Sequence, residues 1–251
     1  MSKQMKTHPS SSGAVHTAAD LEHAMLAQAN PADAEILMRF FKTGPGQYGE
    51  GDKFLGCKNP VTRRTAKAFC DLPVREAVLA AHSEWHELRL CALLILADKY
   101  QSKKADERER AAIFEHYADL ARGGFVNNWD LVDLTAPDIT GAYAFEHGVN
   151  SLERFAASGH LWEERIAVLS MFPFIRAKQP DEPFRMVDRF LPHPHDLMHK
   201  ACGWMLREIG KRDRAALTAY LEKNKAVMAR TTLRYAIEHY SEPERKAFLS
   251  K

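Results

Sequence analysis

Trp129 and Asp133 combine residue types and a spacing that could do chemistry. They stand four residues apart within residues 127–133, so on a helix they share one face, one turn apart. An indole attracts a cation through its π face and a carboxylate attracts it through its charge, so the pair suits a positively charged ligand or intermediate. The alternative is structural, with Trp129 anchoring the helix and Asp133 bonding a helix cap.

Two further residues are candidates for the same site. Arg165 follows Trp162 by three residues at the start of an apolar helical pattern, and its planar guanidinium group can bind a phosphate with two parallel hydrogen bonds. An ion pair with a neighbouring helix would explain Arg165 equally well. Trp204 follows small residues at 201–203 that would let another protein chain or a nucleic acid approach closely, although its spacing also suits the hydrophobic core.

Positive charge concentrates toward the C-terminus, although the chain as a whole is nearly neutral, with 35 basic and 33 acidic residues. Together with nearby aromatic residues, this local excess is typical of a surface that binds a phosphate backbone. A solvated helix face with ion pairs one turn apart is the alternative. The nine basic residues in 196–235, against four acidic ones, are Lys200, Arg207, Lys211, Arg212, Arg214, Lys223, Lys225, Arg230 and Arg234.

A histidine cluster has part of a metal-ligand spacing. His195 and His199 are four residues apart, with His193 just before them and Cys202 just after. No glutamate stands between His195 and His199 as in the HExxH motif of zinc peptidases, so we expect no metal ion. The chain has no GxSxG turn for a serine nucleophile, and we expect no other cofactor.

The elements that must position these residues are helices. Arg89, Arg165 and Lys200 open similar motifs, whose spacing corresponds to a repeat of roughly 35–40 residues, typical of a HEAT-like helical pair. We therefore predict an all-α fold, an α-solenoid with a concave basic face. Another repeat is expected near residue 127. The sequence there departs from the repeat pattern, and such a departure can indicate a functional site.

Local signals predict where helices begin and where they are interrupted. Asn30 and Asn59 each precede a proline, which predicts two capped helix starts. The glycine-rich residues 43–53 predict a loop, and no Gly-Lys-Ser/Thr closes it into a nucleotide-binding motif.

Length and composition exclude several classes of protein. The chain has 251 residues, 45% hydrophobic and 27% charged, unlike a disordered or collagen-like chain. Its four cysteines form no CxxC pair, so we expect a reducing compartment, the cytoplasm. No apolar run approaches the ~18–20 residues that span a bilayer, so we expect no membrane contact. Residues 1–15 are expected to be disordered or foreign to the fold, and residues 16–251 to form one domain.

Several sequence blocks resemble those of the AlkD-type DNA alkylation repair proteins, a family of alkylpurine DNA glycosylases with HEAT-like repeats. The resemblance implies a solenoid that binds double-stranded DNA on its concave face. It also implies monofunctional excision of cationic N3- and N7-alkylated purines, as in base excision repair. The blocks follow the family's order across roughly residues 20–250 and are 44–52, 54–56, 127–133, 162–165, 200–208 and 232–238.

The resemblance also assigns site residues. Trp129, Asp133 and Trp204 match the family's catalytic cleft, and Arg165 matches its arginine beside the DNA backbone. Phe40 stands where some relatives have a tyrosine near the DNA. Phe40 can pack but cannot donate a hydrogen bond, a role that Tyr48 in the glycine-rich loop could take. We expect the other DNA contacts from Lys200, Arg207, Lys211, Arg212 and Arg234.

The family's chemistry agrees with the residue types. A cationic alkylated purine already leaves readily, so the enzyme has to stabilise the positive charge that develops on the sugar. Asp133 would do this by its charge and would position the attacking water, while the indoles add cation–π attraction. The resemblance implies no Schiff-base lysine, no strand cleavage and no full extrusion of the base. A concave DNA clamp works as a monomer, so no obligate protein partner is expected.

Two other functions fit the same residues. A non-catalytic solenoid would bind DNA or a protein through the same face, with salt-sensitive DNA binding and no base release. Such a protein has no need for Trp129 and Asp133 one helical turn apart, which favours catalysis. A metal-dependent hydrolase built on His193, His195 and His199 is the weaker alternative, and full activity in excess chelator would exclude it.

Overall fold

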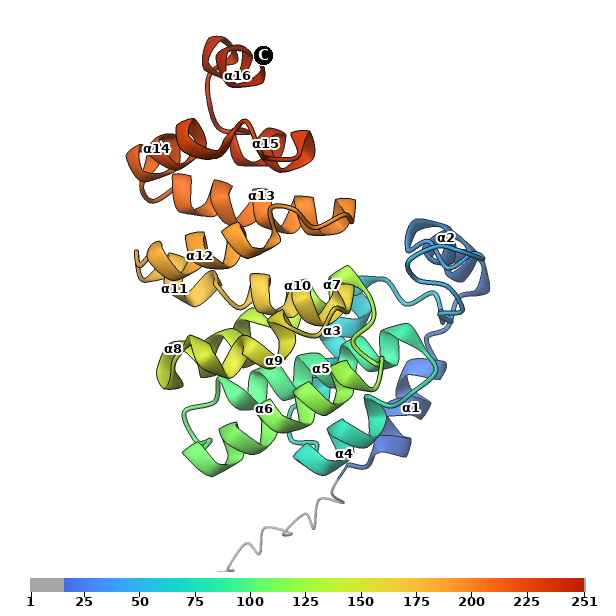
Figure 1. Ribbon diagram of the computed structural model, residues 1–251. Coiled ribbons are helices and arrows are strands. Elements are labelled where there is room, and N and C mark those ends of the chain that lie inside the picture. Colours follow the sequence, from blue (N-terminus) through green and yellow to red (C-terminus); the bar gives the residue numbers. More distant parts are fainter. Residues whose placement is uncertain (1–15, 251) are drawn as a thin grey trace, which may run out of the picture.

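The structure, a computed structural model, describes residues 16–250, which form helices and no β-strand apart from one isolated bridge. The helices stack into a solenoid, with α1 near one end and α16 at the other (Figure 1). The predicted all-α solenoid is confirmed, while residues 1–15 lie outside the described residues. The helices are α1 (Ala18–Leu26), α2 (Pro31–Phe40), α3 (Asn59–Ala68), α4 (Val74–Ala80), α5 (His86–Tyr100), α6 (Glu107–Arg122), α7 (Trp129–Thr135), η1 (Pro137–Gly141), α8 (Ala142–His147), η2 (Val149–Leu152), α9 (Glu153–Ala156), α10 (Leu161–Leu169), α11 (Phe172–Arg176), α12 (Asp181–Phe190), α13 (Asp196–Gly210), α14 (Arg214–Asn224), α15 (Arg230–Ala236) and α16 (Glu242–Leu249).

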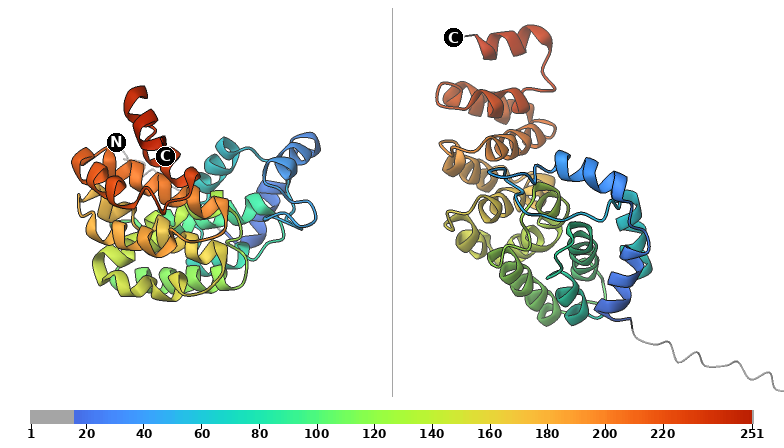
Figure 2. Two further views of the ribbon diagram at one scale, coloured as in Figure 1. Left: turned by 45° about the horizontal axis from the view of Figure 1, so that its top comes forward. Right: turned by 90° about the vertical axis from the view of Figure 1, so that its right-hand side faces the viewer.

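Two rows of helices build the solenoid. In the inner row α5, α7, α10, α13 and α15 each pack against the next. Outer helices cover this row, α4 and α6 packing on α5, and α12 and α14 packing on α13. The two views of Figure 2 show this layered stack from further directions. Arg89, Arg165 and Lys200, the basic positions of the predicted repeat, all lie on inner helices, in α5, α10 and α13.

Helix α7 occupies the place where the repeat departs from its pattern. It continues without a break through the π-helical turn η1 into α8. Pro137 explains this turn, because a proline has no N–H to donate to the carbonyl of Asp133 four residues earlier. The chain instead makes a wider hydrogen bond, from the amide of Gly141 to the carbonyl of Ala136 at 2.8 Å.

The segment between α1 and α3 leaves the stack as a separate lobe, the α2 lobe, beside the ends of α10 and α13 (Figure 1). Asn30 caps α2 with its side chain, as its position before a proline predicts. Ala34, Phe41 and Phe54 give the lobe a small core of its own. Gly56 turns the chain back with φ +86°, and a Cβ there would lie 2.0 Å from the Asn30 carbonyl oxygen, so only glycine fits.

Helix α5 lies at the centre of the main hydrophobic core, which extends from α1 to α16. Nearly all of its side chains are buried, including the charged Glu87 and Arg89. The apolar run around Arg89 therefore forms a buried helix. None of the described helices is both long and apolar enough to cross a membrane.

Two local features differ from the sequence prediction. Helix α3 begins at Asn59 itself, with Lys58 in the N-cap position, so the Asn59 side chain does not cap it. Gly203 in α13 does allow a close approach, but the approaching element is α15 of the same chain. A Cβ on Gly203 would lie 2.7 Å from the Thr232 carbonyl oxygen, so the space before Trp204 is already filled.

Candidate active site

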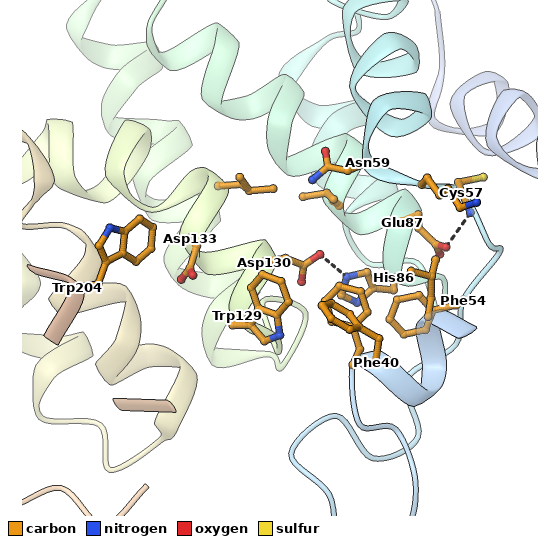
Figure 3. A pocket seen from close by; sticks show the side chains of 15 residues that line it. Phe40, Phe54, Cys57, Asn59, His86, Glu87, Trp129, Asp130, Asp133 and Trp204 are labelled. Atoms are coloured by element: carbon orange, nitrogen blue, oxygen red, sulfur yellow. Dashed lines mark hydrogen bonds and ion pairs between the residues drawn. The ribbon is translucent and has the colours of Figure 1, made fainter. Parts of the chain in front are cut away.

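A cleft lies between the α2 lobe and the inner helices α7, α10 and α13. It consists of two adjoining hollows, of about 370 Å³ and about 590 Å³, which we call the aromatic hollow and the basic hollow. Phe40, Trp129, Asp133 and Trp204 line both of them. Figure 3 shows Asp133 between the two indoles, with Phe40 beyond Trp129. The three predicted catalytic residues therefore meet at the junction of the two hollows.

Asp133 is held by a bidentate ion pair with Arg165. The guanidinium Nε and Nη2 each donate to a different carboxylate oxygen at 2.8 Å, and the side chains are 12% and 5% exposed. Nη1 of Arg165 donates to the Leu197 carbonyl at 2.6 Å, which joins α7, α10 and the start of α13. Burial raises the pKa of the Asp133 carboxyl, and the neighbouring guanidinium opposes that shift.

The interpretations left open for Asp133 and Arg165 can be compared with their contacts in the structure. Asp133 does not cap a helix, because the side chain of Asn128 accepts from the first amide of α7 at 2.9 Å. Arg165 makes the interhelical ion pair that was the alternative to phosphate binding. Arg165 already makes three donor contacts to protein atoms, and its contact with the DNA backbone stays a prediction.

A column of stacked rings fixes Trp129 against the α2 lobe. Trp129 stacks on Phe41 with ring centroids 5.2 Å apart, Phe41 on Phe54 at 5.1 Å, and Phe54 on His86 at 4.3 Å. Phe40 meets Trp129 edge-on at 5.8 Å and remains 59% exposed at the rim. Ring packing therefore holds the lobe and α7 together, while Phe40 is free to contact a ligand.

Beneath this column lies a buried charged cluster that the sequence did not reveal. His86 Nδ1 contacts Asp52 at 2.8 Å and His86 Nε2 contacts Asp130 at 2.9 Å, while Arg89 donates to the other Asp52 oxygen at 2.6 Å. Burial alone would lower the pKa of His86, but the two carboxylates outweigh it and raise that pKa to about 9. A protonated His86 thus ties the lobe to α5 and α7.

The basic hollow carries the positive charge of the cleft. Arg165, Lys200 and Arg207 line it against the single carboxylate of Asp133. Tyr48 reaches it from the glycine-rich loop and meets Trp162 edge-on at 5.9 Å. Three cations and a phenol therefore line a space large enough for part of a ligand's backbone.

Comparison with known proteins identifies the family of this chain. A sequence profile of the DNA alkylation repair enzyme family matches residues 21–240. The chain belongs to this family. A solved structure of a protein from Enterococcus faecalis, described as a predicted DNA alkylation repair enzyme, has a TM-score of 0.66 to this chain. The likeness covers 85% of this chain and 97% of that one at 15% identity, so it concerns the fold. No curated protein sequence gives a significant match.

In this DNA alkylation repair enzyme, the predicted DNA contacts divide into two groups. Phe40, Tyr48, Lys200 and Arg207 line the cleft. The others do not line it. Lys211 lines a further hollow that shares Arg207, Arg212 lines a hollow beside Ile175 and Gln179, and Arg234 is exposed on α15. Lys211 and Arg212 follow the end of helix α13 at Gly210, whereas Arg207 lies within it.

In this repair enzyme, the histidines at 193, 195 and 199 make contacts around the start of α13. His195 accepts from the Leu197 amide at 3.1 Å and caps the helix. His193 Nε2 contacts Glu164 at 2.9 Å, and the His199 ring contacts the His193 carbonyl. No group of three metal-ligating side chains is found among residues 16–250.

Proposed function

We propose that this DNA alkylation repair enzyme is a monofunctional glycosylase that hydrolyses the N-glycosidic bond of cationic N3- and N7-alkylated purines in duplex DNA. The observation that carries the proposal is the placement of the Asp133 carboxylate, inside the cleft, between Trp129 and Trp204 and at the junction of the two hollows. The Enterococcus faecalis protein with this fold is itself described as a predicted DNA alkylation repair enzyme, which agrees with a DNA substrate.

The charge of Asp133 fits the bond that has to break. A purine that is alkylated at N3 or N7 carries a positive charge, so it leaves as a neutral base without a general acid. The sugar then takes up the positive charge, and a nearby carboxylate stabilises it most strongly in a dry site. Arg165 holds both Asp133 oxygens in place, so the carboxylate does not have to reorganise as the charge develops.

Trp129 and Trp204 complete the environment of the sugar. Their rings enter the cleft from α7 and α13, one on each side of Asp133 (Figure 3). Trp204 is fixed edge-on against Phe172, with centroids 5.0 Å apart. Two indole rings stabilise a cation better than a neutral sugar, so their attraction grows toward the transition state. A water that attacks the sugar carbon is positioned by Asp133.

Lys200 and Arg207 supply the contacts to the DNA backbone in this proposal. Each lies one turn of α13 from Trp204, and all three side chains line the basic hollow. Their partners are acidic residues at the surface, Asp196 at 2.9 Å for Lys200 and Glu238 for Arg207. A phosphate can displace such exposed carboxylates at little cost, because exposed ion pairs contribute only ~0–1 kcal/mol.

Replacing Arg207 by alanine should weaken binding to undamaged duplex DNA and lower the slope of log affinity against log salt by about 1. Arg212→Ala is the matched control, because Arg212 also pairs with one carboxylate, that of Glu208, but lies outside the cleft. We expect the control to keep the wild-type slope. Fluorescence anisotropy over a salt series measures the affinity and its salt slope for each variant. Equal effects of the two variants would refute this placement of the DNA backbone.

The reaction type is tested with a duplex that contains one N7-methylguanine, incubated with the protein in excess chelator. We expect abasic sites, seen as strand breaks only after treatment with alkali. Breaks without alkali would indicate a lyase step and contradict the monofunctional assignment. Loss of activity in chelator would favour a metal-dependent hydrolase, and an intact strand with salt-sensitive binding would favour the non-catalytic solenoid.

A further inference from the structure

The start of α13 is capped by a histidine, which is an unusual residue for this position. The ring Nδ1 of His195 accepts from the Leu197 amide at 3.1 Å. Serine, threonine, aspartate and asparagine are the common N-cap residues, because their side-chain oxygens accept from the free amides at any pH near neutrality. A histidine accepts through a ring nitrogen only while that nitrogen carries no proton. The cap of α13 therefore depends on a neutral imidazole.

A second histidine continues this arrangement into the preceding loop. The Nδ1 of His193 accepts from the His195 amide at 3.1 Å, and its Nε2 lies 2.9 Å from a carboxylate oxygen of Glu164 on α10. Two successive N–H···N hydrogen bonds thus order the backbone of residues 193–197. The contact with Glu164 fastens this loop to the helix that also carries Arg165.

Leu197 links the cap to the cleft. Its amide donates to His195, and its carbonyl accepts from Nη1 of Arg165 at 2.6 Å at the wall of the basic hollow. Arg165 uses its other donors, Nε and Nη2, to hold the two Asp133 oxygens at 2.8 Å. The position of the first turn of α13 is therefore passed on to Asp133 through a single guanidinium group.

Charged and titratable groups surround His195 from α10, from α13 and from the preceding loop. Burial lowers the pKa of the His195 imidazole and the neighbouring His193 adds to that shift, whereas Asp196 opposes it. The positive N-terminal end of a helix also disfavours an imidazolium. The ring is therefore uncharged at neutral pH and takes up a proton only in acid. The groups that face it are His193 with its partner Glu164, Asp196 with its partner Lys200, His199 and Arg165.

We infer that His195 is a positioning residue for Asp133, that it acts through Leu197 and Arg165, and that it does so only as a neutral imidazole. This inference rests on the proposed glycosylase function and adds to it a loss of rate in acid. When Nδ1 takes a proton from solvent, His195 releases the Leu197 amide and brings a second positive charge toward Arg165. The Leu197 carbonyl then no longer fixes that guanidinium group, and Asp133 loses the support on which electrostatic preorganisation depends.

The loss of the cap should loosen the first turn of α13 without unfolding the helix. Asp196 accepts from the Thr231 hydroxyl at 2.9 Å, which fastens this turn to α15 independently of His195. We therefore expect His195→Ala to excise an alkylated purine about fivefold more slowly than the wild type at neutral pH. His195→Asn supplies a cap oxygen that does not titrate, so it should restore the wild-type rate.

The experiment measures single-turnover excision of N7-methylguanine from duplex DNA between about pH 7.5 and about pH 5, with the spontaneous release subtracted. The wild type should slow by about fivefold or more as His195 takes up its proton, and His195→Asn should keep its rate to lower pH. A protonated Asp133 would also slow the reaction, but it would do so equally in both proteins. His160→Asn is the matched control and should follow the wild type, because the exposed His160 stands at the N-cap of α10 and makes no cap bond.

A spectroscopic measurement separates this inference from the glycosylase assignment. The NMR signals of the Leu197 amide and of the Arg165 Nε–H should shift with the same midpoint as the His195 ring in the wild type. Over that pH range both signals should stay constant in His195→Asn. Identical pH–rate profiles of wild type and His195→Asn, or an Arg165 signal that does not follow His195, would overturn the inference. Shifts at one midpoint without any base release would refute the glycosylase and support the link from His195 to Arg165.

Discussion

Asp133→Asn should excise an alkylated purine about 10²–10³ times more slowly than the wild type, the loss that follows removal of one preorganised electrostatic contact in a transition state. The asparagine keeps the shape of the side chain and removes its charge, so the developing cation on the sugar loses its counter-ion. Affinity for undamaged duplex DNA should change little, because Asp133 contributes no contact to phosphate. Single-turnover excision and anisotropy measure the two quantities separately.

The ion pair with Arg165 makes a control necessary. Removing one partner of a buried pair typically costs ~3–5 kcal/mol of stability, so Asp133→Asn also lowers the free energy of unfolding. The double variant Asp133→Asn/Arg165→Gln removes the stranded charge and should recover much of this loss. If Asp133 is catalytic, the double variant stays slow. Recovery of excision together with stability would mean that Asp133 has only a structural role.

His86→Gln should destabilise the fold strongly and in a pH-dependent way. The folded-state pKa of His86 is raised to about 9, above its unfolded value near 6.5. The contribution of His86 to the free energy of unfolding is therefore fully present below about pH 6.5 and is lost as pH rises through 9. The shift corresponds to about 3 kcal/mol. The difference in unfolding free energy between wild type and His86→Gln should therefore narrow by roughly that amount from mildly acidic to alkaline pH.

Urea denaturation across this pH range measures the effect. His23→Gln is the control, because His23 is exposed on α1, and its curve should follow the wild type at every pH. A difference in unfolding free energy between wild type and His86→Gln that is constant with pH would show that folding does not raise the pKa of His86. The buried cluster would then hold the α2 lobe by hydrogen bonds alone.

The fold and part of the cleft are predictable from the sequence because they depend on local patterns. The spacing of Arg89, Arg165 and Lys200 indicates the helical repeat. The spacing of Trp129 and Asp133 indicates a shared helix face. Asn30 before a proline indicates a helix start, and the glycine-rich residues 43–53 indicate a loop. Apart from the repeat, each of these signals needs only a few neighbouring positions.

Other features depend on residues brought together from distant elements. Asp52, His86 and Asp130 come from a loop and two helices, and no spacing links them. The choice between phosphate and carboxylate as the partner of Arg165 is likewise set by how α7 packs on α10. Gly203 signals close approach, but only the structure shows that α15 makes it. The π-helical turn does have a local signal, Pro137 inside an otherwise continuous helix.

The most direct test of the glycosylase assignment is chromatographic detection of free 7-methylguanine after wild-type protein acts on methylated duplex DNA, with Asp133→Asn in parallel. The assignment predicts release of the intact base by the wild type and a release rate reduced about 10²–10³-fold in the variant. No release by the wild type, with tight and salt-sensitive binding to the same DNA, would contradict it and make the cleft a DNA-binding surface without catalysis.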